Sequence, residues 1–175
     1  MSFSEKYILN FVYGIGYYGE LTSILIVLAI LHKDLWILLF FILGTVLNSY
    51  LNAVWLKPWL KEPRPKNPIK FLASDNFSDK LMHYGMPSGH SETIFFSIMY
   101  LYLTTHDFYP WVLLLLIIAV LVFVERLTFH NHTMNQLIVG AIVGSVIAAA
   151  VVYVRDEIKN NYFQYLKRTF PFLFN

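Results

Sequence analysis

The sequence contains no cysteine and few charged residues. Without cysteine, the 175 residues form neither a disulfide framework nor a thiolate metal site. Charged residues make up 14% of the chain, against about 25% in a typical soluble domain. The formal net charge is only +2 and the basic residues gather in one loop, so no nucleic-acid partner is expected. The first residues also lack the basic segment and small-residue cleavage site of a removable signal peptide.

Apolar residues dominate instead, at 57% of the chain with a mean hydropathy of +0.55. A helix needs about 20 apolar residues to cross a membrane. Five runs meet or approach that length, at residues 16–31, 35–56, 91–105, 111–129 and 136–154. The sequence therefore predicts an all-α fold, a polytopic membrane helix bundle with about five transmembrane helices plus short interfacial helices.

One connection between these spans is much longer than the others. Residues 57–87 hold five of the seven prolines, and a long loop of this kind is usually functional. Neither side of the loop is large enough to form a domain of its own. We therefore expect a single membrane-embedded domain over residues 1–175, with its core at about 57–154 and an interfacial tail at 155–175.

The first polar cluster, KPWLKEPRP, follows the second predicted span. Lys57 and Arg64 are separated by six residues. Together they offer a point charge and a bidentate guanidinium, which suit a phosphate group. Basic residues beside a membrane helix also commonly reach toward lipid head groups, so this cluster alone leaves both explanations open.

The second cluster, GMPSGHSE, enters the third predicted span. Ser88 and Gly89 stand where a helix start exposes unpaired backbone N–H groups, which predicts a cradle for an anion. His90 at its mouth is a candidate proton donor to a leaving oxygen. The alternative is an ordinary helix entry, with Ser88 as the cap and His90 at the interface.

The third cluster, ERLTFHNHTMNQ, joins the last two predicted spans. Arg126 adds a third cation, and His132 is a candidate nucleophile toward phosphorus. Gln136 follows His132 by four residues, on the same helical face if the helix has already begun, where its oxygen would accept the other ring N–H and select the tautomer. The alternative is again that these residues only reach toward the membrane interface and take no part in chemistry.

Antiparallel packing of five spans places all three clusters on one side of the membrane. Three cations in one site would repel a divalent ion, and no HExxH-type spacing occurs, so neither a metal nor another cofactor is expected.

Together the clusters resemble the signature of the type-2 phosphatidic acid phosphatase superfamily. That signature is K, six residues, RP; then PSGH; then SR, five residues, H, three residues, D. Nine specified residues occur here in order and with the required internal spacing, within 57–65, 87–90 and 126–132. Two positions depart from it, because Glu125 replaces the serine and Gln136 replaces the aspartate.

The resemblance implies a membrane enzyme that removes phosphate from a lipid phosphate or diphosphate. His132 would form a phosphohistidine, and His90 would protonate the leaving oxygen and later activate water. The phosphoryl oxygens would be held by Lys57, Arg64, Ser88, Gly89 and Arg126. The resemblance also implies an active site on the luminal or extracytoplasmic side.

The segments YGMPSGHSE and HTMNQ are most similar to the dolichyl diphosphate phosphatase branch, which has YGMPSSHSQ and HTWSQ. A polyprenyl diphosphate is therefore the expected substrate. A phosphatidate or phosphatidylglycerol-phosphate phosphatase would use the same residues. Glu125 and Gln136 also leave open a catalytically silent member that binds anionic lipid.

Overall fold

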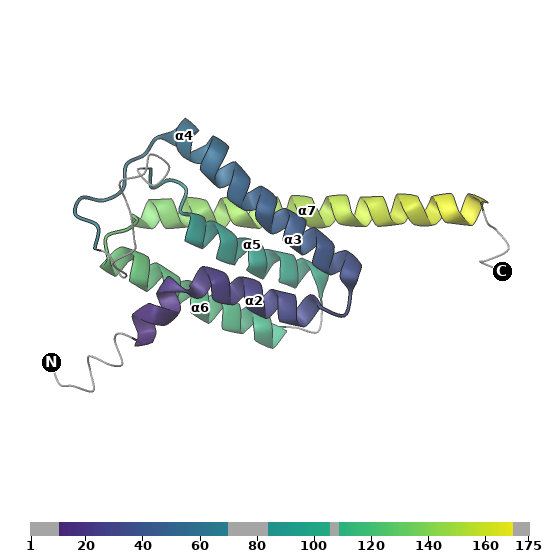
Figure 1. Cartoon of the computed structure of the whole chain (residues 1–175), viewed down its shortest axis with the longest axis horizontal. Coiled ribbons are helices and arrows are strands. Elements are labelled where there is room, and N and C mark those ends of the chain that lie inside the picture. The colour runs from purple at the N-terminus through teal and green to yellow at the C-terminus, as the bar shows by residue number, and fades with distance from the viewer. Residues whose placement is uncertain (1–10, 70–83, 106–108, 170–175) are drawn as a thin grey trace.

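The computed structural model describes residues 11–69, 84–105 and 109–169, and the regular structure of these residues is helical throughout (Figure 1). Its elements are α2 (Gly19–Leu31), α3 (Leu35–Tyr50), the π-helix η1 (Leu51–Leu56), α4 (Lys57–Leu60), α5 (Gly89–Thr104), α6 (Tyr109–Thr128) and α7 (Met134–Thr169). The prediction of an all-α membrane bundle is confirmed.

In the described parts of the chain, three helical segments are long and apolar enough to cross a membrane. They are Leu35–Leu60, Tyr109–Thr128 and Met134–Tyr165. A fourth arises if the short helix Phe11–Tyr17 and α2, which meet at a bend of 68°, count as one span. With 16 residues, α5 is shorter than the usual crossing length, so the fifth crossing stays a prediction.

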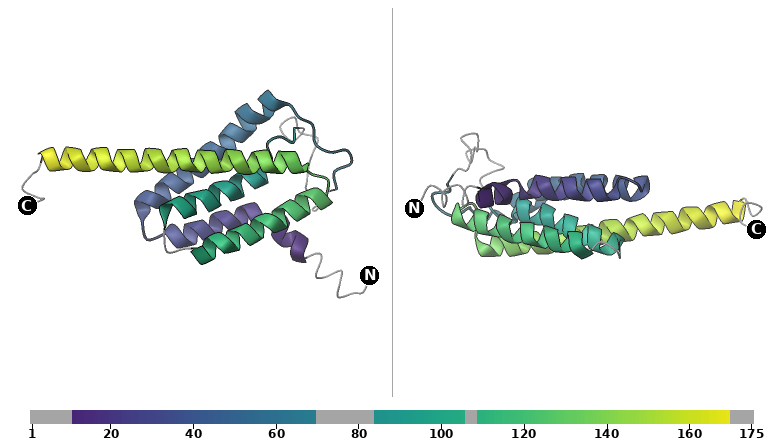
Figure 2. Two further views of the ribbon diagram at one scale, coloured as in Figure 1. Left: turned by 180° about the vertical axis from the view of Figure 1, so that it is seen from behind. Right: turned by 90° about the horizontal axis from the view of Figure 1, so that it is seen from below.

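Helix α5 lies at the centre of the bundle. It packs against α2, α3, α6 and α7, and the views in Figure 2 show it enclosed by them. More than half of its residues are buried, including the polar Ser91, Glu92 and Ser97. A helix that faces protein on most sides needs little lipid-compatible surface, and this one can carry polar groups into the bundle.

Two glycines let α7 approach α5 closely. A side chain at Gly140 would lie 2.6 Å from the carbonyl oxygen of Ser88, and one at Gly144 would overlap the main chain of Glu92. The four-residue spacing of small residues is typical of close helix contacts in lipid. It brings the first turns of α5 and α7 together, and both carry predicted site residues.

The π-helix η1 places Lys57 inside the bundle. Asn48, Asn52 and Lys57 are all buried, although they are spaced by four and then by five residues. The N–H of Lys57 donates to the carbonyl of Asn52, a bond across five residues that widens the helix. This extra residue keeps Lys57 on the buried face of the span that α3, η1 and α4 form together.

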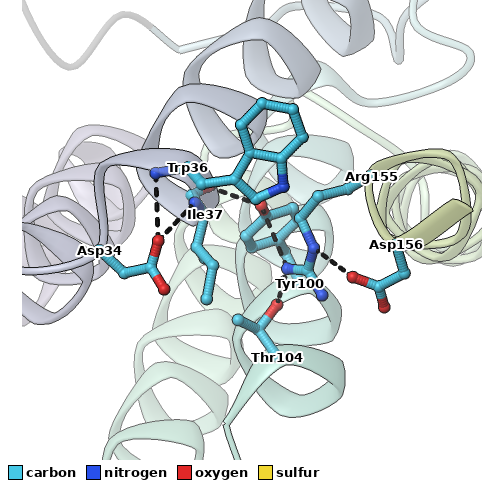
Figure 3. Close-up of polar contacts among 7 residues, drawn as sticks. All are labelled: Asp34, Trp36, Ile37, Tyr100, Thr104, Arg155 and Asp156. Atoms are coloured by element: carbon cyan, nitrogen blue, oxygen red, sulfur yellow. Dashed lines mark hydrogen bonds and ion pairs between the residues drawn. The ribbon is translucent and has the colours of Figure 1, made fainter. Parts of the chain in front are cut away.

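At the opposite end of the bundle, Arg155 ties α7 to α5 and α3 (Figure 3). Its guanidinium donates to Thr104 at 2.8 Å, to the Tyr100 hydroxyl at 3.4 Å and to Asp156 at 2.8 Å. The same hydroxyl donates to the carbonyl of Ile37 at 2.7 Å. Arg155 is 5% exposed, so its charge is compensated within the protein.

Residues 155–169 continue α7 without a break and extend beyond the bundle (Figure 1). This differs from a separate tail helix, because neither glycine nor proline interrupts the chain between Gly144 and Pro171. Ile158, Tyr162 and Tyr165 are exposed along this extension. Its place in the membrane interface stays a prediction.

Candidate active site

The residues of the three sequence clusters lie at one end of the bundle. The ends of α4 and α6 and the starts of α5 and α7 meet there (Figure 1). The chain after α4 crosses this end, where Pro63 pairs with Tyr84 and Ile69 donates to the carbonyl of Phe129 at 2.8 Å. Segments far apart in the sequence thus enclose a single site.

His132 and Gln136 form the buried centre of this site. Nδ1 of His132 lies 3.1 Å from Oε1 of Gln136, and both side chains are almost fully buried. The amide nitrogen of Gln136 donates to Oε1 of Glu62 and to the carbonyl of Pro63, each at 2.9 Å. Because both of these partners are acceptors, the amide oxygen must face His132.

Arg64 approaches the other ring nitrogen of His132. Its NH1 group lies 3.0 Å from Nε2 and also donates to the carbonyl of Asn131 at 2.9 Å. A guanidinium only donates, so Nε2 is the acceptor and Nδ1 carries the proton that goes to Gln136. Gln136 and Arg64 together select one neutral tautomer of the ring.

The same surroundings favour the neutral form of His132. Burial holds the pKa of His132 well below its usual range, and the positive charge of Arg64 lowers it further. Burial and the neighbouring Arg126 lower the pKa of Arg64 to about 10, which leaves the guanidinium charged at neutral pH. The site therefore pairs a neutral imidazole with a cation.

The turn between α6 and α7 positions Arg126 beside this group. His130 takes a positive φ of 54°, and the N–H groups of Asn131 and His132 donate to the carbonyl of Arg126 at 2.9 and 3.3 Å. Nε of Arg126 lies 2.7 Å from Glu125, and the guanidinium lies over the ring of Tyr17. Glu125 thus orients Arg126 from the position where the signature has serine.

The hydroxyl of Ser88, at the start of α5, does not cap this helix. Ser88 is fully buried, and within the described parts of the chain its Oγ has no hydrogen-bond partner. Its N–H donates to the carbonyl of Gln136 at 3.1 Å, which joins the two helix starts. A side chain at Gly89 would make only ordinary contact with Asn52, at 3.7 Å. As far as the described residues show, space therefore remains beside this first turn.

His90 faces α2. Its Nδ1 lies 3.4 Å from Oε2 of Glu20, and both side chains are about one-third exposed. His90 lies within electrostatic range of Lys57, Arg64, Arg126 and His132. The structure therefore brings the two histidines and the three cations of the sequence analysis to one place.

Lys57 enters from the side of η1. It lies within electrostatic range of Arg64, Glu92 and Glu20. Glu92 is fully buried and accepts a hydrogen bond of 2.5 Å from Asn52, which also lies 3.4 Å from the carbonyl of Pro87. These side chains brace the first turn of α5 against the π-helix.

Sequence reasoning missed three residues that shape the site: Glu20, Glu62 and Gly85. Glu20 had a signal, since a carboxylate beside an apolar run needs a partner. Glu62 lay inside the first cluster, but nothing local linked it to Gln136. A side chain at Gly85 would overlap the amide of Gln136, and this crowding is visible only in three dimensions.

Comparison with protein families adds one finding. The family model described as the PAP2 superfamily matches residues 34–159. This range contains all eight predicted site residues and excludes α2. Neither the curated proteins nor the solved structures gave a match to the chain.

Proposed function

The chain belongs to the PAP2 superfamily, whose members are phosphatases, and on this premise we propose that it hydrolyses a polyprenyl (dolichyl-type) diphosphate through a phosphohistidine on His132. The main support for this function is the way in which Gln136 and Arg64 hold the ring of His132. Its ring is neutral, its tautomer is selected, and the lone pair of Nε2 points toward a cation. A buried neutral imidazole held in this way suits nucleophilic attack on phosphorus.

The reaction has two steps. Nε2 of His132 attacks the terminal phosphorus, a P–N bond forms, and the P–O bond to the polyprenyl phosphate breaks while His90 gives its proton to the leaving oxygen. Water then attacks the phosphohistidine, His90 takes a proton from that water, and the P–N bond breaks. Inorganic phosphate leaves, and both histidines return to their starting forms.

The phosphoryl oxygens are held by Lys57, Arg64, Ser88, Gly89 and Arg126. When substrate enters, the NH1 group of Arg64 turns from Nε2 of His132 to a phosphoryl oxygen. It keeps its hydrogen bond to the carbonyl of Asn131. The hydroxyl of Ser88, which has no partner among the described residues, and the N–H groups of the first turn of α5 complete the cradle. Three cations offset the charge that spreads over these oxygens in the transition state.

A pocket beside His90 suits the lipid part of the substrate. It has a volume of about 190 Å³ and is lined by Tyr17, Tyr18, Glu20, Leu21, Ile24 and His90. Mainly apolar walls near the proton donor suit the prenyl carbons that follow the phosphate of the leaving group. The similarity of HTMNQ to the dolichyl branch supports a polyprenyl diphosphate over phosphatidate or phosphatidylglycerol phosphate. We also propose that the site opens on the luminal or extracytoplasmic side.

Phosphate release tests the proposal directly. The detergent-purified protein is assayed in EDTA with polyprenyl diphosphate, phosphatidate and phosphatidylglycerol phosphate. We expect polyprenyl diphosphate to be cleaved fastest, His132→Ala to abolish release, and His32→Ala, an exposed histidine beyond the end of α2, to leave it unchanged. Preference for another lipid would reassign the substrate. Absence of release from all three would favour a silent member that binds anionic lipid.

A further inference from the structure

Glu20 carries a carboxylate at the start of an otherwise uncharged helix. The helix reads GELTSILIVLAIL, and a charged group near lipid is retained only where it has partners. Thr93 of α5 hydrogen-bonds to Glu20, and Nδ1 of His90 lies 3.4 Å from its Oε2. The carboxylate therefore points into the bundle, toward the first two turns of α5.

The surroundings of His90 are otherwise positive. Lys57 of α4, Arg64 of the following loop and Arg126 of α6 face it, together with the ring of His132. Each of these cations opposes a positive charge on the imidazole. Glu92, the carboxylate closest to His90 along α5, is directed to Asn52 instead. Among the residues that the structure describes, Glu20 is thus the acidic side chain that contacts His90 and offsets these charges.

We propose that Glu20 is a positioning residue for His90, holding the Nδ1–H and supporting the protonated ring that gives its Nε2 proton to the leaving oxygen. The inference rests on the proposed function of His90 as the acid. Its structural basis is independent, because α2 lies outside the residues matched to the superfamily. The pocket beside His90 is lined by the same carboxylate, so Glu20 stands at the leaving-group side of the site.

Two readouts separate this role from a merely structural one. The first is the pH dependence of kcat/KM with polyprenyl diphosphate. The second compares phenyl phosphate with 4-nitrophenyl phosphate, which needs less help from an acid because its phenol is more acidic. We expect Glu20→Gln to move the alkaline limb to lower pH. It should also lower kcat by about 10-fold or more for phenyl phosphate, a part of the roughly 10²–10⁴-fold that a general acid contributes, and by clearly less for 4-nitrophenyl phosphate.

Glu20→Asp keeps the charge and should restore part of the activity. Glu157→Gln, an exposed site on the extension of α7, is the matched control and should behave like the wild type. An unchanged alkaline limb in Glu20→Gln, or equal losses with both aryl phosphates, would overturn the inference while leaving the phosphatase activity established.

A third readout does not need turnover. Diethylpyrocarbonate modifies unprotonated histidine, so the pH midpoint of His90 modification, followed by peptide mass spectrometry, reports its protonation. The midpoint should move to lower pH in Glu20→Gln. This shift in a protein that cleaves no lipid would support the ion pair and count against the proposed function, whereas an unmoved midpoint would overturn the ion pair itself.

Discussion

At the scale of single residues, both the oxygen and the nitrogen of the Gln136 amide have suitable hydrogen-bond partners. It accepts from His132 and from the N–H of Thr133, and it donates to Glu62 and to the carbonyl of Pro63. A carboxylate at this position would accept from His132 but would repel the other two oxygens. Glutamine therefore suits this position, and Glu62 places a carboxylate one hydrogen bond further from His132.

Exchanging the two side chains tests this arrangement. Gln136→Glu places a carboxylate against Glu62 and Pro63, and leaving such buried groups unsatisfied costs about 1–3 kcal/mol. We expect kcat to fall by about 10- to 100-fold, since 1.4 kcal/mol corresponds to a factor of about ten. Adding Glu62→Gln supplies a donor to the new carboxylate and should recover most of the loss. A double variant as slow as Gln136→Glu would contradict the network.

Alanine substitutions at two glycines of the same segment, Gly85 and Gly89, should have opposite effects on the site. Gly85→Ala drives a methyl group into the amide of Gln136, so it should release His132 from its selected tautomer and remove most activity. Gly89→Ala meets only Asn52 at 3.7 Å and should leave the fold intact. Steady-state kinetics together with thermal unfolding of both variants make the comparison. Full activity in Gly85→Ala would show that Gln136 does not need its present position.

The charge of Arg64 predicts a direction of pH dependence. Burial and Arg64 lower the pKa of His132, so on the proposed function His132 should stay neutral as the pH falls and activity should persist in mild acid. Arg64→Gln removes one of these two causes and raises the pKa of His132. We expect the acid limb of kcat/KM, which reports groups of the free enzyme, to move to higher pH in the variant. An acid limb that stays in place or moves to lower pH would argue against His132 as the group that titrates.

At the scale of helices, length and hydropathy predicted most elements but not their irregularities. The starts and ends of α2, of α3 and η1 taken together, of α5 and of α6 lie within about three residues of the predicted runs, within the usual uncertainty of helix boundaries. The apolar sequence around residues 51–56 does not predict the π-helix. The π-helix only changes the spacing between buried polar residues. Only the packing around Asn52 and Lys57 reveals it.

A larger side chain between α7 and α5 should lower both the stability of the protein and its activity. Gly144→Leu would push against the main chain of Glu92, which has no rotamer to change, and overpacking typically costs about 1–3 kcal/mol. The displaced turn of α5 carries His90, so phosphate release should fall together with the unfolding temperature. Ala149→Leu adds similar bulk at an exposed position of α7 and serves as the control. Equal behaviour of the two variants would exclude this contact as the constraint.

At the scale of the whole molecule, the positions of the site residues were predictable and their partners were not. Antiparallel spans bring segment ends to one side, so Lys57, Arg64, His90 and His132 were expected to meet. The contacts of Glu20 with His90 and of Glu62 with Gln136 join residues more than 65 positions apart in the sequence. A single sequence carries no periodic or local signal for such pairs, and only the folded bundle shows them.

The distance between the two polar ends of the bundle predicts that stability and catalysis can be separated. Arg155→Ala removes the hydrogen bonds to Thr104 and Tyr100 and the guanidinium that lies over the Tyr100 ring, a loss of about 1.5–3 kcal/mol for a charged hydrogen-bonded group. We expect a lower unfolding temperature but unchanged KM and pH dependence, because the active site lies at the other end of the bundle. Lys159→Ala, exposed one turn further along the helix, should change neither property. If Arg155→Ala altered the pH profile of phosphate release, the two ends would be coupled through α7, and the site could not be treated as independent of the network around Arg155.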